Sequence, residues 1–492
     1  MVRSDVGIDD HLEMRVCGAR VAAFILPAVM VALTILARAV PNVSLISIIA
    51  IYVITFIAML VFTIYDYIAN CESDMSYALI CPLSLSIFMN LFLSAIALRL
   101  SSGVASVLLS SNILYSLVVS LVAVLCEYCR GELRGMAQGA WVTLCILTVY
   151  AFVLFVMNPV TITSFLSTFR NLITPFSFLL LGATLSRRVS LTAVCDLIVT
   201  FGLIVVAFGL FELFVFQSFW VDFNLEDLWR LKGIPVSDIH LPVNFYSSER
   251  FAGVHVRRMT SLFADPVNLG TFLFSMFLVA WYRRRWIAAA IACVGCVLTI
   301  SKGALLGFLI WVFIYCLIKS DRIWVKRAAL LFVVAAAAGF LIFSFANSTG
   351  SVAAHMRGAI GGIISIVQNP FGYGCGNVGV LAALANDTAM RGAEESGFGV
   401  VAGEVGVVGI AAYISIFVFG VKTSISLDEK RGRIVALTLL LSIFANIVFN
   451  EVALSPNSCG IYFSVLGVML GASELKPWLN FRMAEGHVVA GD

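Results

Sequence analysis

The sequence predicts an all-α, polytopic integral membrane protein of about 12 to 14 transmembrane helices, with two long loops on one side of the membrane. Of the 492 residues, 61% are hydrophobic and only 12% are charged, and the mean hydropathy is +1.03. Apolar runs long enough to cross a bilayer recur along nearly the whole chain, and the basic residues gather in the connections between them. These observations exclude a soluble globular domain.

Each apolar run of about 17 to 25 residues is taken as one membrane helix, because that length crosses the hydrocarbon core. The first half of the chain holds seven such runs, at residues 21–40, 43–65, 78–98, 103–126, 140–160, 172–185 and 191–216. The second half holds seven more, at residues 266–282, 286–300, 304–318, 328–345, 397–421, 434–450 and 460–471. Runs 172–185 and 460–471 are short, so re-entrant segments stay open for both, and the count can change by about two.

The basic connections predict the orientation of the chain. They fall on one side of the membrane, which the positive-inside rule makes the cytoplasmic side, at residues 130–134, 187–188, 283–285, 319–327 and 422–433. Both termini are then cytoplasmic, and the long loops 217–265 and 346–396 are periplasmic. Residues 1–20 are polar and charged, so we expect the first span to be an uncleaved anchor. Without an internal repeat, residues 1–492 form a single membrane domain.

The two periplasmic loops carry more cations than the positive-inside rule favours. These cations are Arg230, Lys232, Arg250, Arg257 and Arg258 in the first loop, and Arg357 and Arg391 in the second. Arg38, Arg99, Arg170 and Lys302 map to outer ends of spans. We expect these cations to converge on one outer cavity, and the alternative at each single site is snorkelling to lipid phosphates.

The segment from Arg257 to Gly270 joins two arginines to a helix start. Asp265 before Pro266 predicts an N-cap followed by the first helical residue, since Asp accepts an orphan amide and Pro has no amide to leave unpaired. Two cations beside a positive helix end suit an anionic headgroup such as a diphosphate. Because Asp265 itself fills the helix end, Arg258 is the better candidate for that headgroup.

Two further motifs lie near the outer side. In Thr299–Ala304, Lys302 sits at a tight turn and is either an end anchor or a cation aimed into the cavity. The segment 369–376, which includes Tyr373, is rich in glycine and predicts a tight turn. Its amides either face a polar ligand or close a compact re-entry turn, and a phosphate-binding Walker loop is excluded because Gly-Lys-Ser/Thr is absent.

Glu395 and Glu404 are the two carboxylates near the periplasmic start of the apolar run 397–421. Nine positions separate them, so a continuous helix would turn them to opposite faces. We expect Glu395 to act on a substrate hydroxyl, with a plain loop carboxylate or an arginine partner as the alternative, and Glu404 to pair with another helix. His240, His255 and His355 lack the close spacing of metal ligands, so surface polar roles and no metal site are predicted.

Together, these motifs resemble the O-antigen ligase and polysaccharide polymerase superfamily, the Wzy-type integral membrane glycosyltransferases. The resemblance covers about residues 257–421 and rests on the order, spacing and sidedness of four pieces. These pieces are Arg258–Gly270, Thr299–Gly303, Arg357 with Asn369–Gly374, and Glu395 with Glu404–Gly409.

The resemblance implies a GT-C-like helical fold that acts on undecaprenyl-diphosphate-linked oligosaccharides at the periplasmic face of a bacterial inner membrane. A sugar hydroxyl of one lipid-linked unit would attack the anomeric carbon of another chain, and the lipid diphosphate would leave. Arginine suits this reaction because its planar fork binds diphosphate and stabilises the charge that develops. The implied catalytic residues are Glu395, Arg258, Arg357 and Arg391, and the implied substrate-binding residues are Arg257, Lys302, Asp265, Asn268 and Tyr373.

The implied partners are a lipid-linked donor and acceptor, membrane lipids and a chain-length regulator, without a cofactor, a metal or nucleic acid. The ligases of the superfamily carry a His-Asn pair where this chain has Glu395-Ser396, which favours a polymerase. Lys302 replaces the arginine of the usual Ser-Arg-Gly turn, which puts a direct phosphate role for it in doubt. A glycan ligase is one alternative, and a lipid-linked oligosaccharide flippase is another, although transporters place ionisable residues nearer the bilayer midplane.

Overall fold

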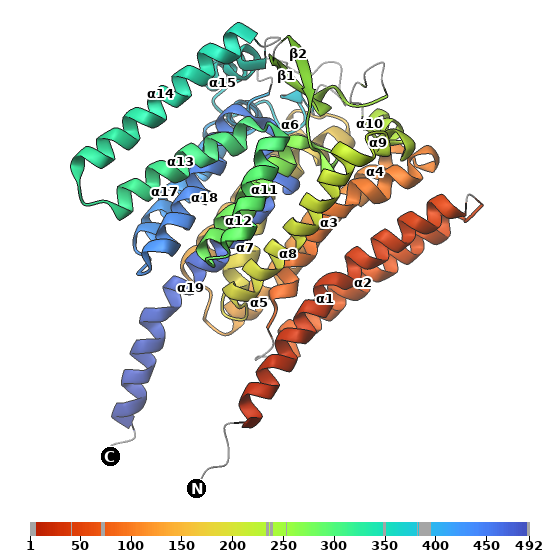
Figure 1. The fold of residues 1–492 in the computed structure, drawn as a ribbon. Coiled ribbons are helices and arrows are strands. Elements are labelled where there is room, and N and C mark those ends of the chain that lie inside the picture. The colour runs from red at the N-terminus through yellow and green to blue at the C-terminus, as the bar shows by residue number, and fades with distance from the viewer. Residues whose placement is uncertain are drawn as a thin grey trace.

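The protein is an all-α, multi-pass membrane protein, as the sequence predicts (Figure 1). The computed structural model describes residues 6–40, 42–69, 74–232, 236, 240–251, 253–347, 351–380, 382 and 395–489. Within these residues, 11 helices are long and apolar enough to cross a membrane, and the apolar helices Pro266–Tyr282 and Trp286–Thr299 are shorter. Helices make up 82% of the structure.

The first half of the chain builds one side of the bundle around a buried helix, α3 (Ser76–Ile96). The most apolar stretch of α3 is buried completely inside the protein. In α2, only 22% of the corresponding stretch is buried. The other long helices of this half are α1 (Val6–Ala39), α2 (Leu45–Ala69), α5 (Ser111–Cys129), α6 (Gly135–Met157), α7 (Ile162–Leu185) and α8 (Leu191–Leu210).

The second half adds α11 (Pro266–Tyr282) and α12 (Trp286–Thr299), which pack beside α8. Its other helices are α13 (Lys302–Lys319), α14 (Ile323–Asn347), α15 (Ser351–Gln368), α17 (Gly397–Ile425), α18 (Lys430–Phe449) and α19 (Pro456–Val489). α7 and α19 pack at close range through Gly182 and Gly467. A β-carbon at Gly182 would lie 2.2 Å from the carbonyl oxygen of Ser464, so only glycine allows this approach.

The connection between α8 and α11, which the sequence predicts as a long loop, contains several short helices and a hairpin. It contains η2 (Phe211–Val215), α9 (Phe219–Asp222), α10 (Leu225–Leu231), η3 (Val243–Phe245) and η4 (Ser261–Phe263). It also forms an antiparallel hairpin of β1 (Tyr246–Phe251) and β2 (Val254–Arg257), in which Tyr246 pairs with Arg257. The hairpin lies at one end of the bundle, and the start of α1 and the end of α19 lie at the opposite end (Figure 1).

Three details of the predicted spans are corrected. Run 172–185 is the second part of the full-length helix α7, so it is not a short or re-entrant segment. Run 103–126 is divided at Ser110 into α4 (Ser102–Leu109) and α5. The predicted second loop, 346–396, contains the helix α15, whose apolar residues are compatible with a helix lying against the bundle.

Candidate functional site

A cavity of about 2440 Å³ opens at the hairpin end of the bundle. Its wall is built by α3, α4, α5, α7, α10, the hairpin, α11, α13, α14, α15 and the segment between α18 and α19. Typical small-molecule sites enclose about 300 to 1,000 Å³, so this cavity has room for a larger ligand. Leu114, Leu166 and Leu341 line it and are also 50%, 53% and 44% exposed on the bundle surface. The cavity therefore reaches the apolar flank of the bundle.

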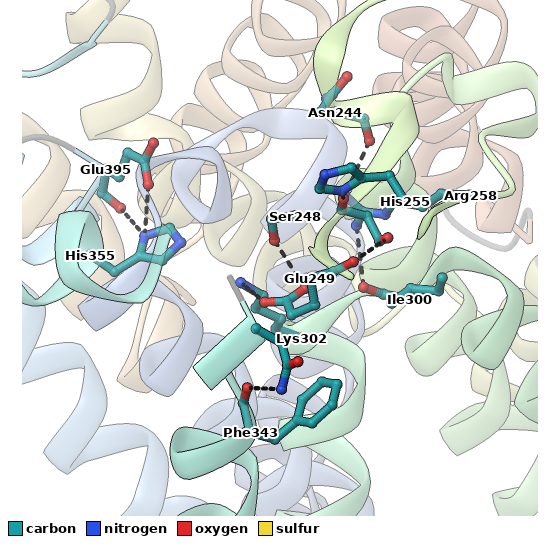
Figure 2. A network of polar contacts seen from close by, with 12 residues as sticks. Asn244, Ser248, Glu249, His255, Arg258, Ile300, Lys302, Phe343, His355 and Glu395 are labelled. Atoms are coloured by element: carbon teal, nitrogen blue, oxygen red, sulfur yellow. Dashed lines mark hydrogen bonds and ion pairs between the residues drawn. The ribbon is translucent and has the colours of Figure 1, made fainter. Parts of the chain in front are cut away.

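Arg258 lies in the cavity wall and is held by backbone carbonyls. Its Nε donates to the carbonyl oxygen of Thr299 at 2.8 Å, and its two terminal nitrogens donate to those of Asn244 at 3.1 Å and Ile300 at 3.4 Å (Figure 2). Burial lowers the pKa of Arg258 to about 10, and the negative charges of Asp265 and Glu249 oppose that shift. Arg258 therefore joins the hairpin region to the turn before α13, in addition to lining the cavity.

Arg257 faces away from the cavity. Its guanidinium lies 2.5 Å from Oε1 of the fully buried Glu212 and 4.7 Å from the ring centre of Phe245. Glu212 also accepts hydrogen bonds from the amides of Thr260 and Ser261, both at 3.3 Å. Arg257 therefore fixes the chain before α11 to η2, and its geometry does not fit the substrate-binding role that the resemblance implies.

Asp265 and Asn268 begin α11 and line the cavity. The N-cap prediction is confirmed, because Oδ1 of Asp265 accepts from the amides of Val267 at 2.7 Å and Asn268 at 3.1 Å. Burial raises the pKa of Asp265, while those amides, Arg258 and Lys232 act in the opposite direction. The side-chain oxygen of Asn268 accepts from the hydroxyl of Ser458 at 2.7 Å, which ties α11 to α19.

Arg170 on α7 and Lys232 after α10 bring two positive charges together in the cavity wall. Nε of Arg170 is buried without a hydrogen-bond partner, and no ion pair of Arg170 occurs within the part of the chain that the structure describes. Lys232 donates from Nζ to Oδ1 of Asn90 at 3.0 Å and lies 4.5 Å from the ring centre of Trp229. Burial, together with the nearby charge of Arg170, lowers the pKa of Lys232 to about 8, against the opposing effect of Asp265. The carboxylate that acts on Lys232, Asp265, is already engaged by backbone amides.

Lys302 is paired with a hairpin carboxylate that sequence reasoning missed. Its Nζ lies 2.7 Å from Oε1 of Glu249, whose side chain is only 4% exposed. The hydroxyl of Ser248 donates to Oε2 of Glu249 at 3.0 Å (Figure 2). Lys302 therefore does aim into the cavity, but Glu249 compensates its charge.

A second carboxylate group lies apart from Arg258, with Glu249 and Lys302 between them in Figure 2. Glu395 has a left-handed backbone with φ of 60°, which few residues other than glycine adopt. Nδ1 of His355 lies 3.4 Å from the Glu395 carboxylate and 3.2 Å from its carbonyl oxygen, which also accepts from the Glu451 amide at 3.1 Å. All three residues line the cavity, so His355 is not the plain surface histidine that its sequence context predicts.

Three predicted site residues do not line the cavity. Arg357 is exposed on α15, and Tyr373 is half-buried on the glycine-rich turn. Arg391 lies outside the described residues. The catalytic roles that the resemblance implies for Arg357 and Arg391 therefore gain no geometric support.

The glycine-rich turn docks on a break in α17, where Gly406 has φ of 57°. The amides of Tyr373 and Gly374 donate to the carbonyl oxygens of Gly403 and Glu404, both at 2.8 Å. The amide of Gly376 donates to Oε1 of Glu404 at 2.9 Å. Of the two interpretations, the compact turn fits this geometry, and Glu404 accepts a hydrogen bond from the turn.

The predicted convergence of cations is therefore partial. The cations that line the cavity are Arg170, Arg230, Lys232, Arg258 and Lys302. Arg38, Arg99, Arg250, Arg257 and Arg357 do not line it. Arg38, for example, donates to the carbonyl oxygen of Asp222 at 2.5 Å. Sequence reasoning identified Arg170 only as one of many cations at span ends, and nothing in the sequence indicated that its Nε is buried without a hydrogen-bond partner.

The wall also contains polar residues that carry no motif, among them Asn112, Asn171, Asn446 and Asn457. Asn446 contacts α13 at Gly303, where an added β-carbon would lie 2.2 Å from its Oδ1. Close packing thus explains the glycine of the Ser-Lys-Gly turn. Among the described residues, no group of three His, Cys, Asp or Glu side chains is placed to hold a metal ion.

Comparison with protein-family models and with curated proteins finds no match for this chain.

Proposed function

We propose that this protein is an integral membrane glycosyltransferase that polymerises undecaprenyl-diphosphate-linked oligosaccharide repeat units at the periplasmic face of a bacterial inner membrane. The motif resemblance suggests this activity, and the cavity supports it by combining a group of cationic and amide side chains with a largely apolar wall on membrane-spanning helices. A lipid-linked diphosphate sugar has the same combination of chemical parts.

The unpaired charge of Arg170 beside Lys232 is the observation that carries the proposal. A buried donor of a charged group that lacks an acceptor costs free energy, so such a group is retained where a ligand compensates it. A diphosphate supplies that compensation, because its oxygens accept hydrogen bonds from a planar guanidinium and from an ammonium group. Arg170 and Lys232 form the proposed diphosphate site, in place of Arg258, Arg357 and Arg391, and Arg258 supports the cavity wall through its three backbone contacts.

In the proposed reaction the cations Arg170 and Lys232 bind the leaving group, and the carboxylate of Glu395 accepts a proton. The acceptor hydroxyl oxygen forms a bond to the anomeric carbon of the donor while the bond from that carbon to the diphosphate oxygen breaks. The diphosphate leaves with the electron pair and is stabilised by Arg170 and Lys232. The hydroxyl proton passes to the carboxylate of Glu395, which is 45% exposed and lies on the side of the cavity away from Arg258 (Figure 2).

Purified protein in lipid nanodiscs, given its lipid-linked repeat unit, is expected to lengthen the glycan without a nucleotide sugar or an added metal. The measurement is the ladder of product lengths on a gel. Glu395→Gln keeps the side-chain shape but removes the proton acceptor, so elongation is expected to slow by about 100-fold or more. Folded protein that translocates the lipid-linked unit across proteoliposomes without lengthening it would reject the polymerase in favour of a transporter.

A further inference from the structure

Three side-chain amides line the same cavity as Arg170 and Lys232 and have no role in the proposed reaction so far. Asn171 follows Arg170 directly on α7, Asn112 lies at the start of α5, and Asn457 lies at the start of α19. All three line the cavity. Nδ2 of Asn112 lies 3.4 Å from Oδ1 of Asn457, which brings these two amides together.

The helices that carry these amides are fixed against one another. The hydroxyls of Ser116 on α5 and Ser177 on α7 are 3.0 Å apart, deeper in the bundle than the amides. α7 and α19 meet at the close glycine contact of Gly182 and Gly467, which leaves little freedom between them. The amides therefore form a preorganised wall, which limits the entropy lost when a ligand binds.

The hydrogen-bonding capacity of this wall is only partly used. Asn171 is 5% exposed, and its Oδ1 is buried without a hydrogen-bond partner. Within the described part of the chain, Asn457 has only the long contact to Asn112. Asn112 by contrast donates to the hydroxyl of Ser86 at 2.9 Å and accepts from the amide of Ile113 at 2.8 Å. A buried amide oxygen that lacks a hydrogen-bond donor destabilises the unliganded protein, so Asn171 points to a polar ligand in the cavity.

We propose that Asn171 and Asn457, positioned by Asn112, bind the hydroxyl groups of the sugar attached to the diphosphate that Arg170 and Lys232 hold. The inference rests on the proposed function and assigns a second ligand class, a neutral pyranose, to the wall next to the anion site. A carboxamide offers one acceptor oxygen and two donor hydrogens, which matches neighbouring sugar hydroxyls that both donate and accept. A phosphate offers acceptors only and leaves the buried Oδ1 of Asn171 unsatisfied.

Two probes separate the sugar from the anion. One is a short-chain polyprenyl diphosphate, and the other is the same lipid with a single pyranose on its diphosphate. The affinity of each for the purified full-length protein in nanodiscs is measured by calorimetry. Asn171→Ala and Asn457→Ala are expected to weaken binding of the sugar-bearing probe by about 3- to 10-fold each, the effect of one or two neutral hydrogen bonds, and to leave the bare diphosphate within about 2-fold.

Control variants test the anion site, an unrelated asparagine and the folding of the asparagine variants. Arg170→Gln is expected to weaken both probes by about 10-fold or more, because it removes a charge from the shared anion site. Asn42→Ala, at an exposed residue between α1 and α2, is expected to leave both affinities unchanged. Asn171→Ser and Asn457→Ser retain a smaller polar group, and melting temperatures identify any variant that loses its fold.

The outcomes distinguish the inference from the proposed function. Equal losses for both probes in the asparagine variants would assign these amides to the diphosphate and overturn the sugar subsite. Unchanged affinities in folded asparagine variants would make them packing residues and overturn it as well. If Arg170→Gln leaves binding of both probes unchanged, the anion site and the proposed function fail, and the sugar subsite fails with them.

Discussion

Arg258 and Arg170 line the same cavity, yet their environments differ in a way that sequence motifs do not reveal. Arg258 belongs to the most conspicuous motif of the chain, and its guanidinium donates to three backbone carbonyl oxygens. Arg170 belongs to no motif, and its Nε is buried without a partner. An arginine that is satisfied by the fold mainly stabilises the wall, whereas one that is left unsatisfied needs a ligand. We therefore assign the binding of the leaving diphosphate to Arg170 instead of Arg258.

The largest expected effect comes from Arg170→Gln. This change removes the unpaired charge and keeps an amide in its place, so we expect elongation to fall by about 100- to 1,000-fold, the range for losing one group that stabilises transition-state charge. The melting temperature is expected to stay the same or to rise, because a partly buried charge with an unsatisfied Nε is removed. Elongation rates and thermal melts of the purified protein check both. Activity near that of the wild type would remove the distinction between the two arginines.

Arg258→Lys is expected to act first on stability. An ammonium group cannot reach three carbonyl oxygens in different directions, so at least one of them is left unsatisfied, with a loss of about 1 to 3 kcal/mol in unfolding free energy. Limited proteolysis of the hairpin and a thermal melt measure this loss. A variant that melts like the wild type but no longer turns over would instead assign Arg258 a direct role on the diphosphate.

Lys232 predicts a pH dependence of anion binding. Its folded pKa of about 8 is below the ordinary value of 10.5, so between these pH values the unfolded chain holds a proton that the native protein has released. Stability from this group therefore rises as the pH increases from about 8 to 10.5. Affinity for a polyprenyl diphosphate changes in the opposite direction and is expected to fall through about pH 8, since the ligand binds the charged form.

Lys232→Gln tests this assignment. The variant lacks the titrating group, so its binding curve is expected to stay flat around pH 8, with Arg170 and Asp265 as the charged groups that remain nearby. Calorimetry from pH 6.5 to about 9.5 covers the window set by the shifted pKa. A transition at pH 8 that persists in the variant would have to come from another group.

Arg357→Ala gives the smallest expected effect. Arg357 is exposed on α15 and does not line the cavity, so we expect elongation and melting temperature to stay within about 2-fold and 1 °C of the wild type. The assay that measures Arg170→Gln serves here too. A large loss of turnover would show that Arg357 reaches the substrate from outside the cavity. It would favour the catalytic role that the resemblance implies for Arg357.

The candidate site could be predicted in part from local chemistry. Asp265 before Pro266 identifies the start of α11, because capping depends on two adjacent residues. The contact between Lys302 and Glu249 could not be predicted, because it joins residues far apart in sequence. The glycine-rich turn was open to two interpretations until its amides were found on Gly403 and Glu404.

The sequence by itself determined that this is an all-α membrane protein, because the length and apolarity of a run decide locally whether it crosses a bilayer. It also determined where α11 begins, from two neighbouring residues. Only the tertiary structure decided which cations share a cavity and which of them are already neutralised. That outcome depends on partners from other helices, as with Glu212 for Arg257 and Glu249 for Lys302, and on their absence at Arg170 among the described residues. Charge compensation is a property of three-dimensional neighbours, so a motif can show where an arginine occurs but not whether its charge is left for a ligand.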